Sequence, residues 1–276
     1  MMRSLWTAAS GMRAQQVNVD TISNNIANVN TTGYKTQTAS FKSLLYQNLQ
    51  SKSTNNVGDL KPVAAEVGLG TRVSAITGTF TQGNLQASDS PFHMAIEGDG
   101  FFTVRTPDGE LRYTRDGSFS VSPTANGNLL CTAEGYPVLD QNGNNIVFPF
   151  TDVATNVIVS DQGVIGFPDE TGNPAPLMNN GYQVKFGLVQ FNNPAGLEKD
   201  GGNCYAVTPA SGEALAETGN NNLKSSKVHQ YYLEGSNVDV ANEIVNLIVA
   251  QRAYEMNSKA IQASDDMMQQ ANNLRS

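Results

Sequence analysis

The chain has 276 residues, of which 39% are hydrophobic and 15% are charged, and its formal net charge is -8. This length can bury a core in one long domain or in two or three small ones. The negative charge provides no attraction for phosphate backbones, so we expect no nucleic acid partner. No apolar run reaches the length of a membrane span or of a secretory signal, so we expect no membrane insertion and no cleaved signal peptide.

The N-terminal segment, residues 1–33, shows heptad spacing and is predicted to be helical. One apolar row repeats every seven residues and a second row follows three residues later, which is the a/d pattern of a coiled coil. We expect the helix to end near Gly33, where Asn and Thr side chains compete for backbone hydrogen bonds. The seam residues expected on this segment are Leu5, Met12, Val19, Ile22, Ile26 and Val29.

Residues 34–79 are predicted to form an extended connector or arm. Within them, residues 47–66 mix Ser, Asn, Lys and Gly around Pro62 with little periodicity. Twenty irregular residues are unusual inside a compact fold. Composition allows two interpretations, a flexible linker or an arm that orders only against neighbouring subunits.

Residues 80–235 have the turn pattern of an antiparallel β domain. Asp-Gly and Asn-Gly pairs separate short β-rich runs, and the residues on either side of Asp108-Gly109 predict a β-hairpin. No helical period interrupts the runs, so a parallel sheet with crossover helices is not expected. The middle of the chain therefore predicts a sandwich or small barrel.

The C-terminal segment, residues 236–276, repeats the heptad spacing. Ser236 can cap its first turn, and Asp239 lies favourably at the positive end of the helix dipole. Residues 1–35 carry a net charge of +2 and residues 236–276 a net charge of -2, which favours pairing of the two ends. The seam residues expected here are Val240, Ile244, Leu247, Tyr254, Ile261 and Met268.

Each helix taken alone could be an ordinary amphipathic helix lying on a globular core. Their positions at the two extremes of the chain, on either side of a self-sufficient β region, favour pairing with each other or with neighbouring molecules. The predicted fold class is α+β, with an inner coiled-coil domain, an extended connector and an outer, mostly antiparallel β domain.

The residue types needed for catalysis are sparse. His93 and His229 are the only histidines, and neither lies in a metal-binding spacing. Cys131 and Cys204 are too few for a zinc ribbon or a disulfide framework, so buried free thiols are expected. Acidic residues such as Glu110 and Asp116 flank turns, where they are common. We expect no enzyme activity, no metal and no cofactor.

Several unusual motifs carry a resemblance to a known family. One runs Ser23-Asn24-Asn25-Ile26-Ala27-Asn28-Val29-Asn30-Thr31-Thr32-Gly33-Tyr34-Lys35. Others are Leu233-Glu234-Gly235-Ser236-Asn237-Val238-Asp239 and Gln251-Arg252-Ala253-Tyr254-Glu255-Met256-Asn257. Together they resemble the bacterial flagellar rod and hook family over most of the chain. The resemblance assigns the family motif to Asn24, Asn25, Asn28, Gly33, Tyr34, Ser236, Asn237, Val238, Gln251, Arg252, Tyr254 and Asn257.

Within that family, the N-terminal sequence and the long connector look most like the distal-rod branch. The resemblance implies a structural subunit that leaves the cytoplasm through the flagellar export apparatus and polymerises into a hollow, torque-transmitting rod in the periplasm. It implies contacts with identical copies, other rod proteins, hook protein and surrounding ring proteins. The alternatives are a proximal rod or hook protein, or an extracellular oligomeric β-domain binding module.

Overall fold

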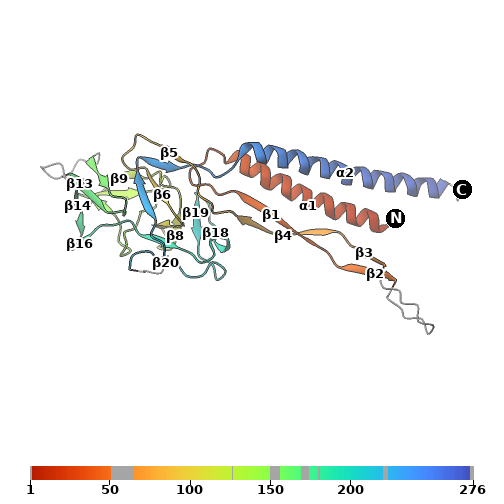
Figure 1. Ribbon diagram of the computed structural model, residues 1–276, viewed down its shortest axis with the longest axis horizontal. Helices are drawn as coiled ribbons and strands as arrows, with labels where there is room; N and C mark the ends of the chain where they lie inside the picture. The colour runs from red at the N-terminus through yellow and green to blue at the C-terminus, as the bar shows by residue number, and fades with distance from the viewer. Residues whose placement is uncertain are drawn as a thin grey trace, which may run out of the picture. The chain divides into compact units, whose positions relative to one another are not determined.

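The computed structural model describes residues 2–50, 65–125, 127–149, 156–168, 174–179, 181–219 and 223–273. The chain divides into two compact units (Figure 1). We call the first the helical unit; it comprises Met1–Ala27, Gln37–Thr77 and Asp239–Ser276. We call the second the β unit; it comprises Asn28–Thr36 and Gly78–Val238.

Both ends of the chain are helical, as predicted, and the two helices lie side by side in the helical unit (Figure 1). Helix α1 spans Met2–Ala27 and helix α2 spans Val240–Asn273. Ser4 near the start of α1 lies 3.3 Å from Ser264 near the end of α2, measured between their Oγ atoms. At the other end, Asn25 Nδ2 donates to Glu243 Oε2 at 3.4 Å. The helices therefore run antiparallel.

Polar residues determine where α1 ends and where α2 begins. Helix α1 stops at Ala27, and Gly33 adopts the left-handed conformation a few residues later (φ 68°). The predicted seam residue Val29 therefore lies beyond the helix, because the polar segment after Ala27 forms turns instead. At the start of α2 the capping side chain is Asp239, whose Oδ1 accepts from the amide nitrogen of Ala241 at 3.0 Å. Ser236 does not cap the helix; its hydroxyl accepts from the Val238 amide at 3.3 Å.

Among the described residues, the remainder of the helical unit is an arm made of two antiparallel strand pairs. Strand β1 (Gln37–Ser43) pairs with β4 (Thr71–Gly78), and β2 (Tyr46–Gln50) pairs with β3 (Ala65–Gly68). Gly70 packs against α1, because a Cβ there would stand 2.0 Å from the hydroxyl oxygen of Ser10. The described flanks of the predicted connector are thus paired strands, and residues 51–64 lie outside the described part of the chain.

The β unit is built from short antiparallel strands, as the turn pattern predicted. Its largest sheet has six strands in the order β18-β19-β8-β7-β17-β20. The predicted hairpin is confirmed, since β7 pairs with β8 with Thr103 opposite Tyr113, and Gly109 in its turn has φ 86°. The elements are β5 Leu85–Ala87, β6 Met94–Glu97, β7 Phe101–Arg105, β8 Leu111–Thr114, β9 Ser120–Thr124, β10 Gly127–Cys131, β11 Val147–Phe148, β12 Ile158–Val159, β13 Ile165–Pro168, β14 Pro174–Pro176, β15 Met178–Asn179, β16 Tyr182–Gln183, β17 Leu188–Gln190, the 3-10 turn η2 Pro194–Gly196, β18 Glu198–Lys199, β19 Cys204–Ala206, β20 Leu215–Ala216, β21 Lys227–Gln230 and β22 Tyr232–Glu234.

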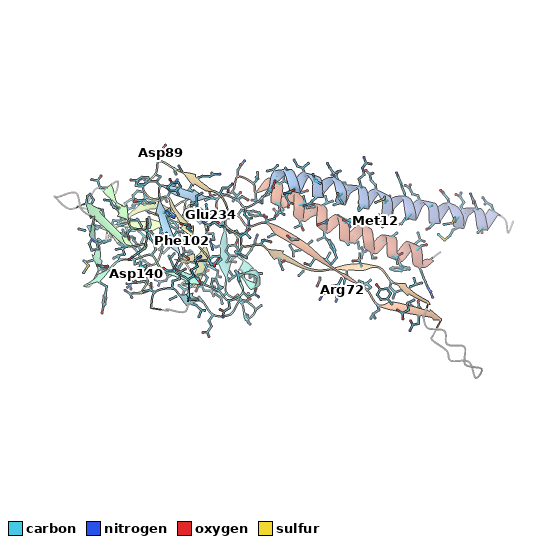
Figure 2. All side chains as sticks on the ribbon, viewed as in Figure 1. Met12, Arg72, Asp89, Phe102, Asp140 and Glu234 are labelled. Carbon is cyan, nitrogen blue, oxygen red and sulfur yellow. The ribbon has the colours of Figure 1, made fainter. Side chains whose placement is uncertain are left out.

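The core of the β unit is aromatic and aliphatic. Phe102 is fully buried at its centre, with its ring centroid 5.0 Å from Phe119 and 5.5 Å from Phe186 (Figure 2). A second cluster gathers around Phe101 and Tyr205. Among the described helices, none has the length and apolarity that crossing a membrane requires.

Candidate assembly surfaces

Small and polar side chains fill the contact between α1 and α2. The contacting residues are seven apart or multiples of seven on both helices: Ser4 meets Ser264, and Gly11 meets Asn257. A Cβ added at Gly11 would lie 3.0 Å from the Asn257 amide atoms, so only glycine allows this approach without a shift of the neighbour. Ala250, one heptad before Asn257, is almost fully buried. The helices therefore approach through short side chains rather than through the large apolar ones.

The predicted seam residues mostly flank this contact. Ile22 is buried, whereas the other large residues of the α1 row are only half-buried. On α2, Leu247, Ile261 and Met268 are half-buried. Val240, Ile244 and Tyr254 are exposed, at 38%, 45% and 42% respectively. Within one molecule, the apolar seams are thus only partly removed from water.

Helix α2 has a second apolar side that the heptad spacing did not predict, and its side chains are more exposed than the predicted seam residues. Val245, Val249, Met256 and Met267 retain 59%, 62%, 64% and 50% of their accessible surface. The spacings between Val245, Val249, Met256 and Met267 are four, seven and eleven residues, so these side chains share one side of a straight α-helix. A search for helical periodicity that was not tied to one heptad row could have found this side.

The opposite net charges of the two chain ends do not form ion pairs between α1 and α2 among the described residues. The ion pair found on α2 joins Arg252 to Glu255 on the same helix at 3.0 Å. Glu243 instead accepts the hydrogen bond from Asn25. The two helices are therefore not held together by ion pairs between their described charged side chains.

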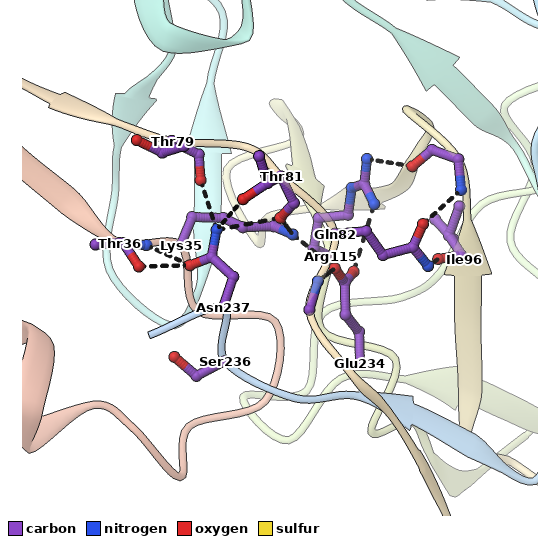
Figure 3. A network of polar contacts seen from close by, with 12 residues as sticks. Lys35, Thr36, Thr79, Thr81, Gln82, Ile96, Arg115, Glu234, Ser236 and Asn237 are labelled. Atoms are coloured by element: carbon purple, nitrogen blue, oxygen red, sulfur yellow. Dashed lines mark hydrogen bonds and ion pairs between the residues drawn. The ribbon is translucent and has the colours of Figure 1, made fainter. Parts of the chain in front are cut away.

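Two asparagines of the family motif hold backbone segments together. Buried Asn25 accepts from the amide nitrogen of Gln37 at 2.9 Å and donates to its carbonyl oxygen at 2.8 Å. In the β unit, the side-chain oxygen of Asn237 accepts from the amide and the hydroxyl of Thr36, both at 2.7 Å (Figure 3). Its amide nitrogen donates to the carbonyl oxygens of Thr79 and Thr81. An aspartate could accept but not donate in this way, which accounts for the amide.

Next to Asn237 lies a buried charge cluster that the sequence did not reveal. Lys35 Nζ lies 2.6 Å from Glu234 Oε1, and Arg115 lies 3.4 Å from Glu234 Oε2, with all three side chains at most 2% exposed (Figure 3). Gly83 also donates its amide to Glu234 at 2.8 Å. Burial, followed by the nearby Arg115 charge, lowers the pKa of Lys35 even though Glu234 opposes the shift. Lys35 and Glu234 belong to the motifs that resemble the flagellar family, and no spacing in the sequence indicated that Arg115 joins them.

The other motif residues have separate local roles. Gly33 is required by its conformation and by space, since a Cβ would lie 2.8 Å from the backbone of Arg115. Tyr34 is buried, with Lys199 Nζ 4.8 Å from its ring centroid. Asn28 accepts from the hydroxyl of Thr31 at 3.1 Å. The structure also places Asn24, Gln251, Arg252 and Tyr254 on exposed sides of the helices, and Val238 half-buried before α2.

The polar residues considered for chemistry are engaged in structure. His93 Nδ1 lies 2.6 Å from the hydroxyl of Ser88, and His229 Nε2 lies 2.8 Å from Glu97. Both cysteines are buried and free, as predicted. In the part of the chain that the structure describes, no group of three histidine, cysteine or acidic side chains is placed to hold a metal ion.

Three family models match the chain. They describe a flagella basal body rod protein over residues 5–35, a flagellar hook protein FlgE/F/G D1 domain over residues 95–167, and a flagellar basal body rod FlgEFG protein C-terminal region over residues 229–274. The flagellar basal-body rod protein FlgG of Borreliella burgdorferi is 43% identical over 100% of this chain and 99% of its own length. The chain belongs to the flagellar basal-body rod protein family.

Other relatives extend this membership across distant bacteria. The proteins named flagellar basal-body rod protein FlgG in Caulobacter vibrioides and Bacillus subtilis are 41% and 36% identical, each over the full length of both chains. These matches confirm the family predicted from the sequence motifs, and the names favour a structural rod component over a hook protein or a binding module. The family models also cover both helices and part of the β unit.

Proposed function

We propose that this rod-family chain polymerises into the hollow distal rod of the flagellum, which transmits torque from motor to hook. The observation that carries this proposal is the exposure of large apolar side chains along the helical unit, on α2 above all. Four of them on one side of α2 are at least half exposed. A subunit that keeps such a surface in water gains stability when identical copies cover it.

The size and geometry of that surface suit a polymer. Full burial of a Val or Met side chain stabilises by about 1.5–3 kcal/mol, so covering Val245, Val249, Met256 and Met267 contributes several kcal/mol per contact. Ordering the terminal helices costs conformational entropy, which opposes this gain. Because burial in the assembly offsets that cost, assembly is coupled to folding of the chain ends. A contact between the exposed side of α2 and a different surface of the next copy is heterologous, and a heterologous contact that does not close into a ring builds a filament.

The remaining parts of the proposal follow from the family. The terminal helices form an inner coiled-coil layer that lines the tube, the β unit lies outside, and the arm of residues 34–79 packs along neighbouring subunits. Other rod proteins, hook protein and surrounding ring proteins are the other partners. The subunit reaches the periplasmic rod through the flagellar export apparatus.

A substitution in α2 tests the polymer. Val249→Asp places a charge on the exposed apolar side, where an assembled contact would bury it without a partner. We expect loss of rods in electron micrographs and loss of motility, whereas the isolated subunit keeps its stability within about 0.5 kcal/mol. The matched control is Val207→Asp, which alters an exposed valine of the β unit and should leave rods intact. Normal rods from Val249→Asp would contradict the proposal.

Hydrogen exchange gives an independent test. On a verified monomer, we expect the amides of α1 and α2 to exchange much faster than those of β7 and β8, because their apolar sides are uncovered. Assembly into rods should slow exchange in both helices. Full protection of the helices in the monomer would show that they need no neighbour.

A further inference from the structure

Helix α1 carries two unpaired charges on the side that faces away from α2. Arg13 lies two residues after Gly11, which touches α2, and a two-residue step on a helix turns the side chain to nearly the opposite side. Asp20 lies five residues before Asn25, another residue that contacts α2, and falls on the same outer side. Both are exposed, and neither forms an ion pair with any described residue.

Helix α2 repeats this arrangement, with the positive charge again preceding the negative one along the chain. Lys259 lies two residues after Asn257, and Asp266 lies two residues after Ser264, both of which contact α1. Lys259 and Asp266 therefore project away from α1, and both are exposed without an ion pair to a described residue. Seven residues separate the charges on each helix, which is two turns or about 10.5 Å.

The two outer rows are complementary only when the helices run antiparallel. In that orientation, a single alignment of the two helices places Arg13 opposite Asp266 and Asp20 opposite Lys259. In a parallel arrangement, an alignment that places one pair of opposite charges together leaves the other two charges without a partner. An alignment that places all four charges opposite one another brings like charges together. Subunits that share one direction along a filament present α1 of one copy antiparallel to α2 of the next, because the two helices are antiparallel within each copy.

Apolar surface accompanies the charges on both sides. A groove beside Arg13 is lined by Trp6, Ala9 and Val17 from α1 and by Arg72 from the arm. Trp6 is 75% exposed. On α2, the exposed Met267 follows directly after Asp266. The groove thus offers cations and apolar surface to a segment that carries a carboxylate and a methionine.

We propose that this groove receives α2 of a second copy, with Arg13 paired to Asp266 and Asp20 paired to Lys259 of the neighbour. This inference rests on the proposed polymerisation and specifies how α2 of one copy is aligned along α1 of the next. Charge pairs at an interface select partner and register more than they add affinity. The apolar side of α2 supplies the binding, and the two charge pairs exclude shifted alignments.

Crosslinking between two single-cysteine variants measures the register directly. Cells carrying both Arg13→Cys and Asp266→Cys subunits yield mixed rods, which are treated with a short thiol crosslinker and run on a denaturing gel. We expect a dimer band, and the same for Asp20→Cys with Lys259→Cys. The control pair Arg13→Cys with Lys259→Cys is displaced by two helical turns and should give no dimer. The parent protein should also give none, because Cys131 and Cys204 are buried.

Charge reversal separates the register from polymerisation itself. We expect Asp266→Arg alone to lose rods and motility, and the double variant Arg13→Asp with Asp266→Arg to regain them. If rods form normally, no on-register dimer appears and Asp266→Arg has no effect, the register is overturned while the polymer stands. If the parent chain forms no rods in these cells, the polymerisation proposal fails instead.

Discussion

The β unit and the helical unit bury their apolar residues to very different extents. In the β unit, large side chains such as Phe102, Ile96 and Leu139 are completely shielded from water. In the helical unit, the buried hydrophobic residues among those described are Ala8, Ala14, Ile22 and Ala250, of which only Ile22 is large. Figure 2 shows the contrast between the crowded side chains around Phe102 and those along the helix bearing Met12.

One chain thus combines a unit whose large apolar side chains are buried with a unit whose large apolar side chains are mostly exposed or half-buried. The β unit has a continuous buried core of aromatic and aliphatic side chains. The helical unit joins its helices through short polar and small side chains and leaves most of its larger apolar residues partly exposed to water.

The largest effect is expected from the core of the β unit. Phe102→Ala should lower the free energy of unfolding by about 3–5 kcal/mol, because the lost ring leaves a cavity among Phe119 and Phe186. Urea unfolding of the purified subunit, followed by circular dichroism, measures this. Tyr254→Ala, at a 42% exposed position of α2, should cost less than about 1 kcal/mol in the same assay. Equal losses would remove the distinction between the units.

The buried charge cluster should give the second largest effect. Glu234→Gln leaves Lys35 and Arg115 buried without their carboxylate, and breaking a buried pair in this way typically costs about 3 kcal/mol. Glu110→Gln is the matched control, since Glu110 is 65% exposed in its ion pair with Arg112 and should contribute less than about 1 kcal/mol. A similar small change for both variants would show that the cluster does not stabilise the β unit.

The smallest effect concerns alkaline pH. Burial raises the pKa of the Cys204 thiol from 9.0 to about 11, so the folded β unit holds this proton where the unfolded chain releases it. The stabilisation is complete below pH 9 and is lost as the pH rises towards 11, with a size of order 2 kcal/mol. Unfolding free energies measured between pH 8 and pH 11 should fall less steeply for Cys204→Ala than for the parent. An unchanged slope would contradict the assignment.

Local features were largely predictable from the sequence. Asp108-Gly109 predicted the β7–β8 hairpin because few residues other than glycine adopt the positive φ found at Gly109. Heptad spacing predicted both helices. It did not predict where α1 ends, because Asn28 and its polar neighbours favour turns over a further helical turn and leave Val29 outside.

Contacts between distant residues were not predictable in the same way. Lys35 and Glu234 are 199 positions apart, and no spacing rule links their charges. The heptad rows also did not indicate which side of each helix faces the other. Small residues such as Gly11 decide this, because they allow the closest approach of the two backbones.

The sequence by itself determined the two terminal helices, the antiparallel β region and the family, since periodicity, turn residues and contiguous motifs are local properties. Only the tertiary structure decided which apolar residues stay exposed, where the charges of the helices point, and how Lys35, Arg115 and Glu234 meet. Those outcomes depend on packing between segments far apart in the chain, where shape and burial select among contacts that the sequence alone leaves equally available.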